Sequence, residues 1–127
     1  NLDKANSCKS SGTQISSSKL NSYTCKIANF ALAPYDNITM KAASTVMGYN
    51  GSNPSSLLSK QLIASEYNYQ NAAYLNGNKN LTMAFLWWGE YVLANPSKFS
   101  STYIIWAKDW FDAYNNTHGG AVNGPLN

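Results

Sequence analysis

Residues 81–94 constrain the fold most strongly, because they read LTMAFLWWGEYVLA and are apolar almost all round. Thr82, Gly89 and Glu90 are the clear polar interruptions. A helix that is apolar on every side has to be covered by other helices. We therefore expect this segment at the centre of a helical bundle.

Apolar residues also recur at helical spacing in four other segments, and Pro or Gly residues mark where each segment ends. Asn, Asp and Ser residues stand where helix N-caps are expected. The predicted helices run from Ser18 to Pro34, from Asp36 or Asn37 to Gly48, from Asn53 to Leu75, from Asn80 to Asn95, and from Ser100 or Ser101 to Gly119.

The chain of 127 residues is the usual size of a single domain. Residues 1–18 are rich in Ser, Asn and Lys and predict an extended arm, whereas residues 119–127 are short and punctuated by Gly and Pro. The sequence thus predicts one all-α domain over residues 1–127. It has a bundle of five helices over residues 19–118, an extended N-terminal arm and an extended C-terminal tail.

The two cysteines, Cys8 and Cys25, are not arranged as C-x-x-C, and His118 is the single histidine. A zinc site would therefore lack ligands, and we predict no metal. A Cys8–Cys25 disulfide that staples the arm is the favoured interpretation, and it would stabilise the fold by about 3 kcal/mol. Two free buried thiols are the alternative.

Four asparagines lie in N-x-S/T sequons and are candidates for glycosylation. They are Asn37, Asn50, Asn80 and Asn115. A disulfide together with sequons indicates a secreted protein. The alternative for Asn37 and Asn80 is that they serve as helix caps.

The charge pattern argues against several partners. The net charge of +3 comes from dispersed lysines without any arginine, which excludes a nucleic-acid partner in our interpretation. No apolar run reaches the roughly 20 residues that a membrane span needs. We expect no cofactor.

The best pair of acids for a glycoside hydrolase is Glu66 and Glu90, which lie beside Tyr67, Trp87 and Trp88. The competing interpretation places such acids at a solvated edge or in a buried hydrogen-bonded group. No G-x-S-x-G motif surrounds any serine, and His118 stands where a histidine caps a helix end. We therefore assign no catalytic residue and predict a protein that is not an enzyme.

Aromatic residues exceed what a small core must hold, with four tryptophans and nine tyrosines in the chain. Exposed Trp and Tyr side chains favour protein interfaces or sugar stacking. The candidates are Trp87, Trp88, Trp106, Trp110 and Tyr103. The alternative is that the last two helices pack face to face and bury most of these rings.

Two asparagines, Asn68 and Asn71, fall inside the third predicted helix, where Asn is a poor helix former. We expect them to form a polar clasp with Gln61 or Asn115 that fixes the register of the bundle.

Three short stretches carry a family resemblance: QLIASEYN at Gln61–Asn68, LANP at Leu93–Pro96 and DAYNN at Asp112–Asn116. Over residues 40–116 the chain resembles a helical module of large secreted bacterial surface proteins. The aromatic segment that commonly precedes that module is missing here. The resemblance implies an all-helical module at or outside the cell surface, and it carries no catalytic residues.

Together these features predict a non-enzymatic extracellular structural or adhesive protein that assembles with copies of itself into a surface layer or filament. A carbohydrate-binding module with exposed Trp and Tyr side chains is the first alternative, with glycans as partners. A small glycoside hydrolase that uses Glu66 and Glu90 is the second.

Overall fold

The computed structural model describes residues 19–117, and within that range every regular element is helical. The elements are α2 (Lys19–Phe30), α3 (Met40–Met47), α4 (Pro54–Gln70), η1 (Leu75–Gly77), α5 (Lys79–Ala94), η2 (Pro96–Lys98) and α6 (Ser101–Thr117). The predicted all-α bundle of five helices is confirmed for this part of the chain. The arm, the tail, Cys8 and His118 lie outside the described residues, so the Cys8–Cys25 disulfide stays a prediction.

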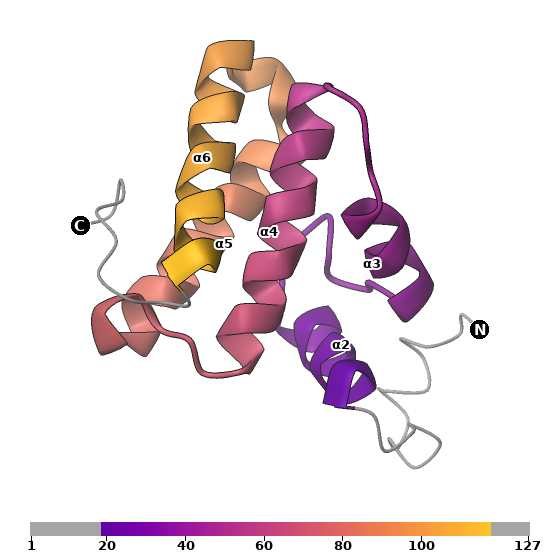
Figure 1. Ribbon diagram of the computed structural model, residues 1–127, viewed down its shortest axis with the longest axis vertical. Coiled ribbons are helices and arrows are strands. Elements are labelled where there is room, and N and C mark those ends of the chain that lie inside the picture. The colour runs from indigo at the N-terminus through magenta and orange to yellow at the C-terminus, as the bar shows by residue number, and fades with distance from the viewer. Residues whose placement is uncertain (1–18, 118–127) are drawn as a thin grey trace.

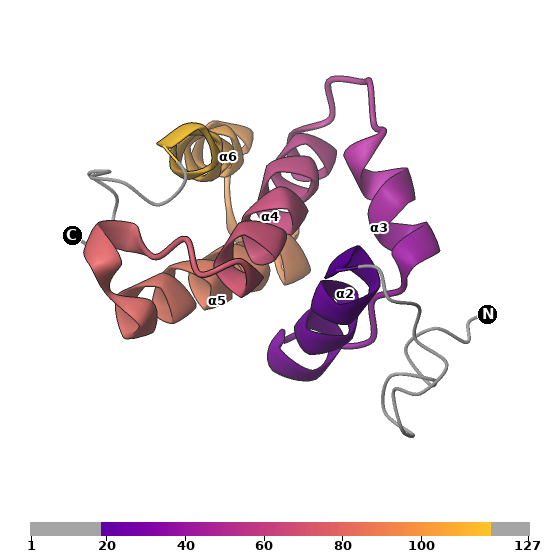
Figure 2. The ribbon, with the colours of Figure 1, turned by 60° about the horizontal axis from the view of Figure 1, so that its bottom comes forward.

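Helix α4 is the centre of the bundle, and it packs against α2, α3, α5 and α6. Figures 1 and 2 show α5 and α6 on one side of α4, and α2 and α3 on the other. The prediction that residues 81–94 form the central helix is therefore wrong. Helix α4 was harder to recognise as central because its sequence, PSSLLSKQLIASEYNYQ, is far more polar overall than that of α5.

The helix starts follow capping chemistry, with two corrections. Asn53 caps α4 as predicted, because its Oδ1 accepts a hydrogen bond of 3.1 Å from the Ser56 backbone N–H. Ser100, one of the two predicted caps, likewise accepts a bond of 3.0 Å from the Tyr103 N–H at the start of α6.

Helices α3 and α5 begin elsewhere than predicted. Thr39 caps α3, in place of Asp36 or Asn37, because the preceding residues form a turn in which the Ile38 N–H donates to the Tyr35 carbonyl. Asn78 caps α5, in place of Asn80, and accepts a bond of 2.9 Å from the Leu81 N–H.

Helix α4 ends at Gln70, before the predicted end near Leu75. Ala72 adopts a left-handed conformation with φ of 64°, and the N–H groups of Ala72 and Ala73 donate to the carbonyls of Tyr69 and Asn68. This is a Schellman cap, which usually has glycine at the left-handed position. An alanine there gives no stop signal in the sequence.

The core between α5 and α6 depends on a close approach at Gly89. The Phe85 and Phe111 rings stack there with centroids 4.2 Å apart. A Cβ atom on Gly89 would lie 2.5 Å from the Phe111 ring, so only glycine leaves room for that ring.

Candidate functional site

Glu66 on α4 and Glu90 on α5 meet in the interior of the bundle. Both side chains are 0% exposed, and the charge of Glu90 acts on the Glu66 carboxyl. Both oxygens of Glu66 and Oε2 of Glu90 are buried without a hydrogen-bond partner in the described part of the chain. Oε1 of Glu90 accepts a bond of 2.8 Å from the Leu32 N–H, a contact that joins the α2–α3 connection to α5. Two buried carboxylates so placed would repel each other, so the pair favours a retained proton.

Burial raises the pKa of both carboxyls. The pKa of Glu66 lies well above its ordinary value, and charge repulsion from Glu90 raises it further. Burial also raises the pKa of Glu90, but the hydrogen bond from the Leu32 N–H opposes that effect. These directions favour retention of a proton by the buried pair, with Glu66 as the preferred site.

Tyrosine hydroxyls surround this pair. Tyr35 is buried and shares a hydrogen bond of 2.6 Å with the Ser59 hydroxyl. Burial raises the pKa of Tyr35 and of Tyr114, which keeps both hydroxyls neutral. Within residues 19–117, the remaining charge that acts on the pair is the carboxylate of Asp36, which further raises the pKa of Glu90.

The burial of the pair bears directly on the hydrolase alternative. A glycosidase needs two carboxyls that face the scissile bond and water. The sequence was right to pair Glu66 with Glu90, yet neither side chain reaches the surface. The burial of both carboxyls therefore argues against the hydrolase alternative.

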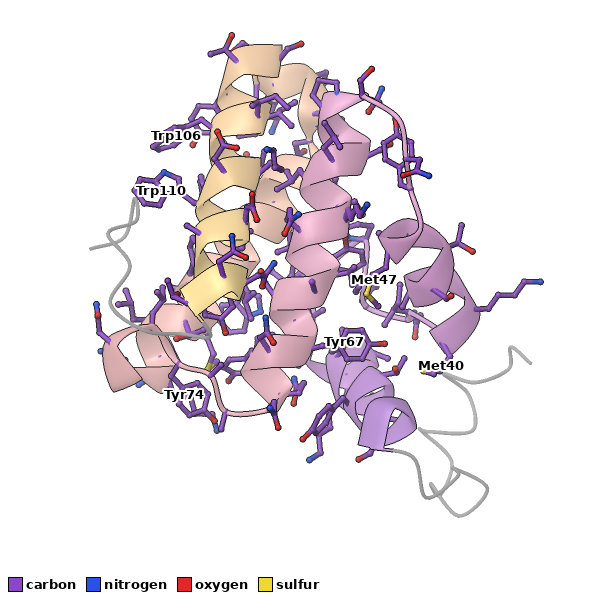
Figure 3. All side chains as sticks on the ribbon, viewed as in Figure 1. Met40, Met47, Tyr67, Tyr74, Trp106 and Trp110 are labelled. Carbon is purple, nitrogen blue, oxygen red and sulfur yellow. The ribbon has the colours of Figure 1, made fainter. Side chains whose placement is uncertain are left out.

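Four of the five aromatic candidates lie together on α5 and α6. Trp106 is 41% exposed, and its ring contacts those of Trp88, Tyr103 and Trp110 at centroid distances between 5.3 and 6.2 Å. Figure 3 shows Trp106 and Trp110 projecting from α6 on the side away from α4. Trp87 does not join them, because its ring stacks on Phe30.

Two further rings extend this surface, and the candidate set from the sequence missed both. Phe99 stacks on Tyr103 with centroids 4.8 Å apart, and Tyr91, which is 49% exposed, packs edge-on against Phe99. Both stand at helical spacing from candidates, Tyr91 three residues after Trp88 and Phe99 four residues before Tyr103, and this spacing could have identified them. We call the continuous surface of Tyr91, Phe99, Tyr103, Trp106 and Trp110 the aromatic strip.

The predicted polar clasp is present between α4 and α6, with one change of membership. The Asn115 amide donates to the Gln61 carbonyl and to its Oε1, each at 3.0 Å, and its Oδ1 accepts from Ser65 and Asn68. Asn71 is not part of it, because Asn71 is exposed at the end of α4 and accepts a bond from Tyr23.

The clasp also distinguishes Asn115 from the other three sequon asparagines. Asn37, Asn50 and Asn80 are exposed, whereas both amide hydrogens of Asn115 are already used in hydrogen bonds. A glycan on Asn115 would break this arrangement. Asn37, Asn50 and Asn80 are therefore the better placed acceptors in the folded chain.

Two further observations concern metals and membranes. Within residues 19–117, no group of three or more His, Cys, Asp or Glu side chains is placed to hold a metal ion. None of the helices in the same range has both the length and the apolar character that a bilayer span requires.

No protein-family model, curated protein or solved structure matches this chain. The resemblance of residues 40–116 to a module of secreted bacterial surface proteins therefore stays a prediction.

Proposed function

We propose that this protein is a non-enzymatic extracellular structural or adhesive protein, and that its aromatic strip is the surface through which copies associate. The observation that carries the proposal is the exposure of Trp106 and Tyr91 within one continuous set of ring contacts. Rings that served the core alone would be covered by their own chain.

The chemistry of the strip suits association between proteins. Trp and Tyr rings give a large apolar area at a small cost in side-chain entropy, and they dominate the binding energy of many interfaces. Lys98 lies 5.5 Å over the Tyr91 ring and its Nζ is 3.3 Å from the Tyr91 hydroxyl, which gives the strip a polar edge. An apolar centre with a polar rim is typical of specific interfaces.

The proposed setting outside the cell draws on other residues. Asn37, Asn50 and Asn80 are exposed sequon asparagines that glycosylation enzymes could modify. We also propose that Cys8 and Cys25 form a disulfide, which would tie residues 1–18 to α2.

Sedimentation analysis tests the proposal at protein concentrations of about 1 to 100 micromolar, the range in which such interfaces associate. We expect the wild-type chain to form oligomers or larger polymers, and the Trp106→Ala variant to associate at least about tenfold more weakly. Leu32→Ala removes a comparably exposed apolar side chain from the α2–α3 connection and should leave association unchanged. A wild-type chain that stays monomeric throughout would overturn the proposal.

Carbohydrate binding by the strip is the second candidate, since the exposed Trp106 ring could stack on a sugar. A glycan array separates the two candidates. Glycan binding by a monomeric wild-type chain that Trp106→Ala abolishes would favour this alternative over self-association.

A further inference from the structure

A second surface feature, separate from the aromatic strip, lies where α2, the end of α4 and the start of α5 meet. It is a hollow of about 490 Å³, within the range of about 300–1,000 Å³ that small-molecule sites occupy. Its apolar wall consists of Phe30, Tyr69 and Tyr74. Figure 3 shows Tyr74 at the end of the bundle near η1, far from Trp106 and Trp110.

The three rings of this wall hold one another in place. Phe30 and Tyr69 stack with centroids 5.0 Å apart, and Tyr74 is tilted against Tyr69 at 5.5 Å. Tyr69 is almost fully buried, while Phe30 and Tyr74 are half-buried and keep part of their surface open. A preformed aromatic wall of this kind can receive the apolar face of a sugar ring.

Amide side chains from two helices add hydrogen-bonding groups to the hollow: Asn29 from α2 and Gln70 from α4. Among residues 19–117, neither of these amides is used in a hydrogen bond to another side chain or to the backbone. An amide both donates and accepts, and so does a sugar hydroxyl. These two groups therefore suit a polyhydroxylated ligand.

The charge of the hollow is positive. Lys26 and Lys79 line it, and none of its described lining residues is acidic. Within the described part of the chain, the salt bridge joins Lys108 to Asp109. Neither Lys26 nor Lys79 is therefore paired with a carboxylate of those residues. Lysine binds an anion as a point charge, and the chain has no arginine that could form two parallel hydrogen bonds to a phosphate. A carboxylate therefore matches the hollow better than a phosphate does.

We propose that this hollow binds a carboxylated sugar, such as a uronic acid. The sugar ring packs on Tyr74, its hydroxyls bond to Asn29 and Gln70, and its carboxylate lies between Lys26 and Lys79. The inference does not depend on the aromatic strip or on self-association.

Titration of ¹⁵N-labelled full-length protein with glucuronate, and separately with glucose, tests the site by NMR. We expect glucuronate to shift the signals of Asn29, Gln70 and Tyr74 and to bind at least about tenfold more tightly than glucose. Lys79→Gln should weaken glucuronate binding by about fivefold, and Lys26→Gln/Lys79→Gln should weaken it further. Lys41→Gln removes the same charge from an exposed position on α3 and should change nothing.

Variants of Tyr74 and Trp106 test whether the Tyr74 ring, and not the aromatic strip, contacts the sugar. Tyr74→Phe should retain binding and Tyr74→Ala should reduce it, because the ring supplies the contact. Trp106→Ala should bind glucuronate as the wild type does, which keeps this test independent of the proposed self-association. Equal binding of glucose, equal binding of inorganic phosphate, or shifts centred on Tyr103 and Trp106 would each overturn the inference.

Discussion

Glu66 on α4 and Glu90 on α5 form an electrostatically coupled pair inside the bundle, and both side chains are fully buried. The Leu32 N–H donates to Glu90 and so attaches the α2–α3 connection to the same pair. A pair of this kind makes the fold depend on one retained proton, because two buried carboxylates in contact would repel each other.

The proton gives the fold a pH dependence. The folded-state pKa of Glu66 is raised above its unfolded value, so its stabilising contribution is complete below about pH 4.3 and is lost as pH rises through the folded-state pKa. Each pKa unit of difference corresponds to about 1.4 kcal/mol. We expect urea unfolding to give a free energy of unfolding that is lower at pH 9 than at pH 6.

Glu66→Gln provides the matched variant, because the amide keeps the size of the carboxyl and does not ionise at any pH tested. It should flatten most of the decline in stability between pH 6 and pH 9, since Glu66 is the carboxyl whose pKa is raised well above its ordinary value. Asp109→Asn removes one exposed carboxylate from α6 and should leave the decline unchanged. A wild-type stability that rises with pH would contradict a retained proton on Glu66.

Gly89→Ala should destabilise the protein by about 1–3 kcal/mol, because the new methyl group would press on the Phe111 ring. Thermal unfolding measures the effect. In a double-mutant cycle, Phe111→Leu should remove part of the Gly89→Ala penalty by clearing that space. Purely additive effects would mean that the two positions do not meet.

Ala72→Gly should stabilise the protein by about 0.5–1 kcal/mol, since Ala72 holds a left-handed conformation that glycine adopts without a Cβ clash. Ala84→Gly, at an exposed position within α5, should instead cost about 1 kcal/mol. Chemical denaturation of the two variants gives the comparison. Destabilisation by both would rule out the Schellman cap.

Asn115→Ala should cost about 1–3 kcal/mol, because it leaves the groups on Gln61, Ser65 and Asn68 without their shared partner. Asn116→Ala changes the exposed neighbouring residue, and its free energy of unfolding should lie within about 0.5 kcal/mol of the wild-type value. Urea unfolding of both variants checks the difference. Equal effects would show that the clasp contributes nothing specific.

Local chemistry determined the helices, and the sequence therefore predicted them well. Asn53–Pro54 and Ser100 start helices because capping needs only neighbouring residues, and Asn95–Pro96 ends α5 for an equally local reason. Two helices end earlier than predicted: α2 ends at Phe30, before Pro34, and α4 ends at Gln70, before Leu75. The larger error, at the end of α4, arose where Ala72 takes a conformation that its side chain does not favour.

Tertiary packing decided which helix is central and which side chains meet. The sequence alone could name Glu66, Glu90 and the tryptophans as candidates, but burial depends on contacts between residues that are far apart in the chain. Packing placed Glu66 and Glu90 together in the interior, set the Trp88 ring against Trp106, and stacked the Trp87 ring on Phe30. Periodicity gives the direction of a side chain on its own helix, whereas only the neighbouring helices determine what covers it.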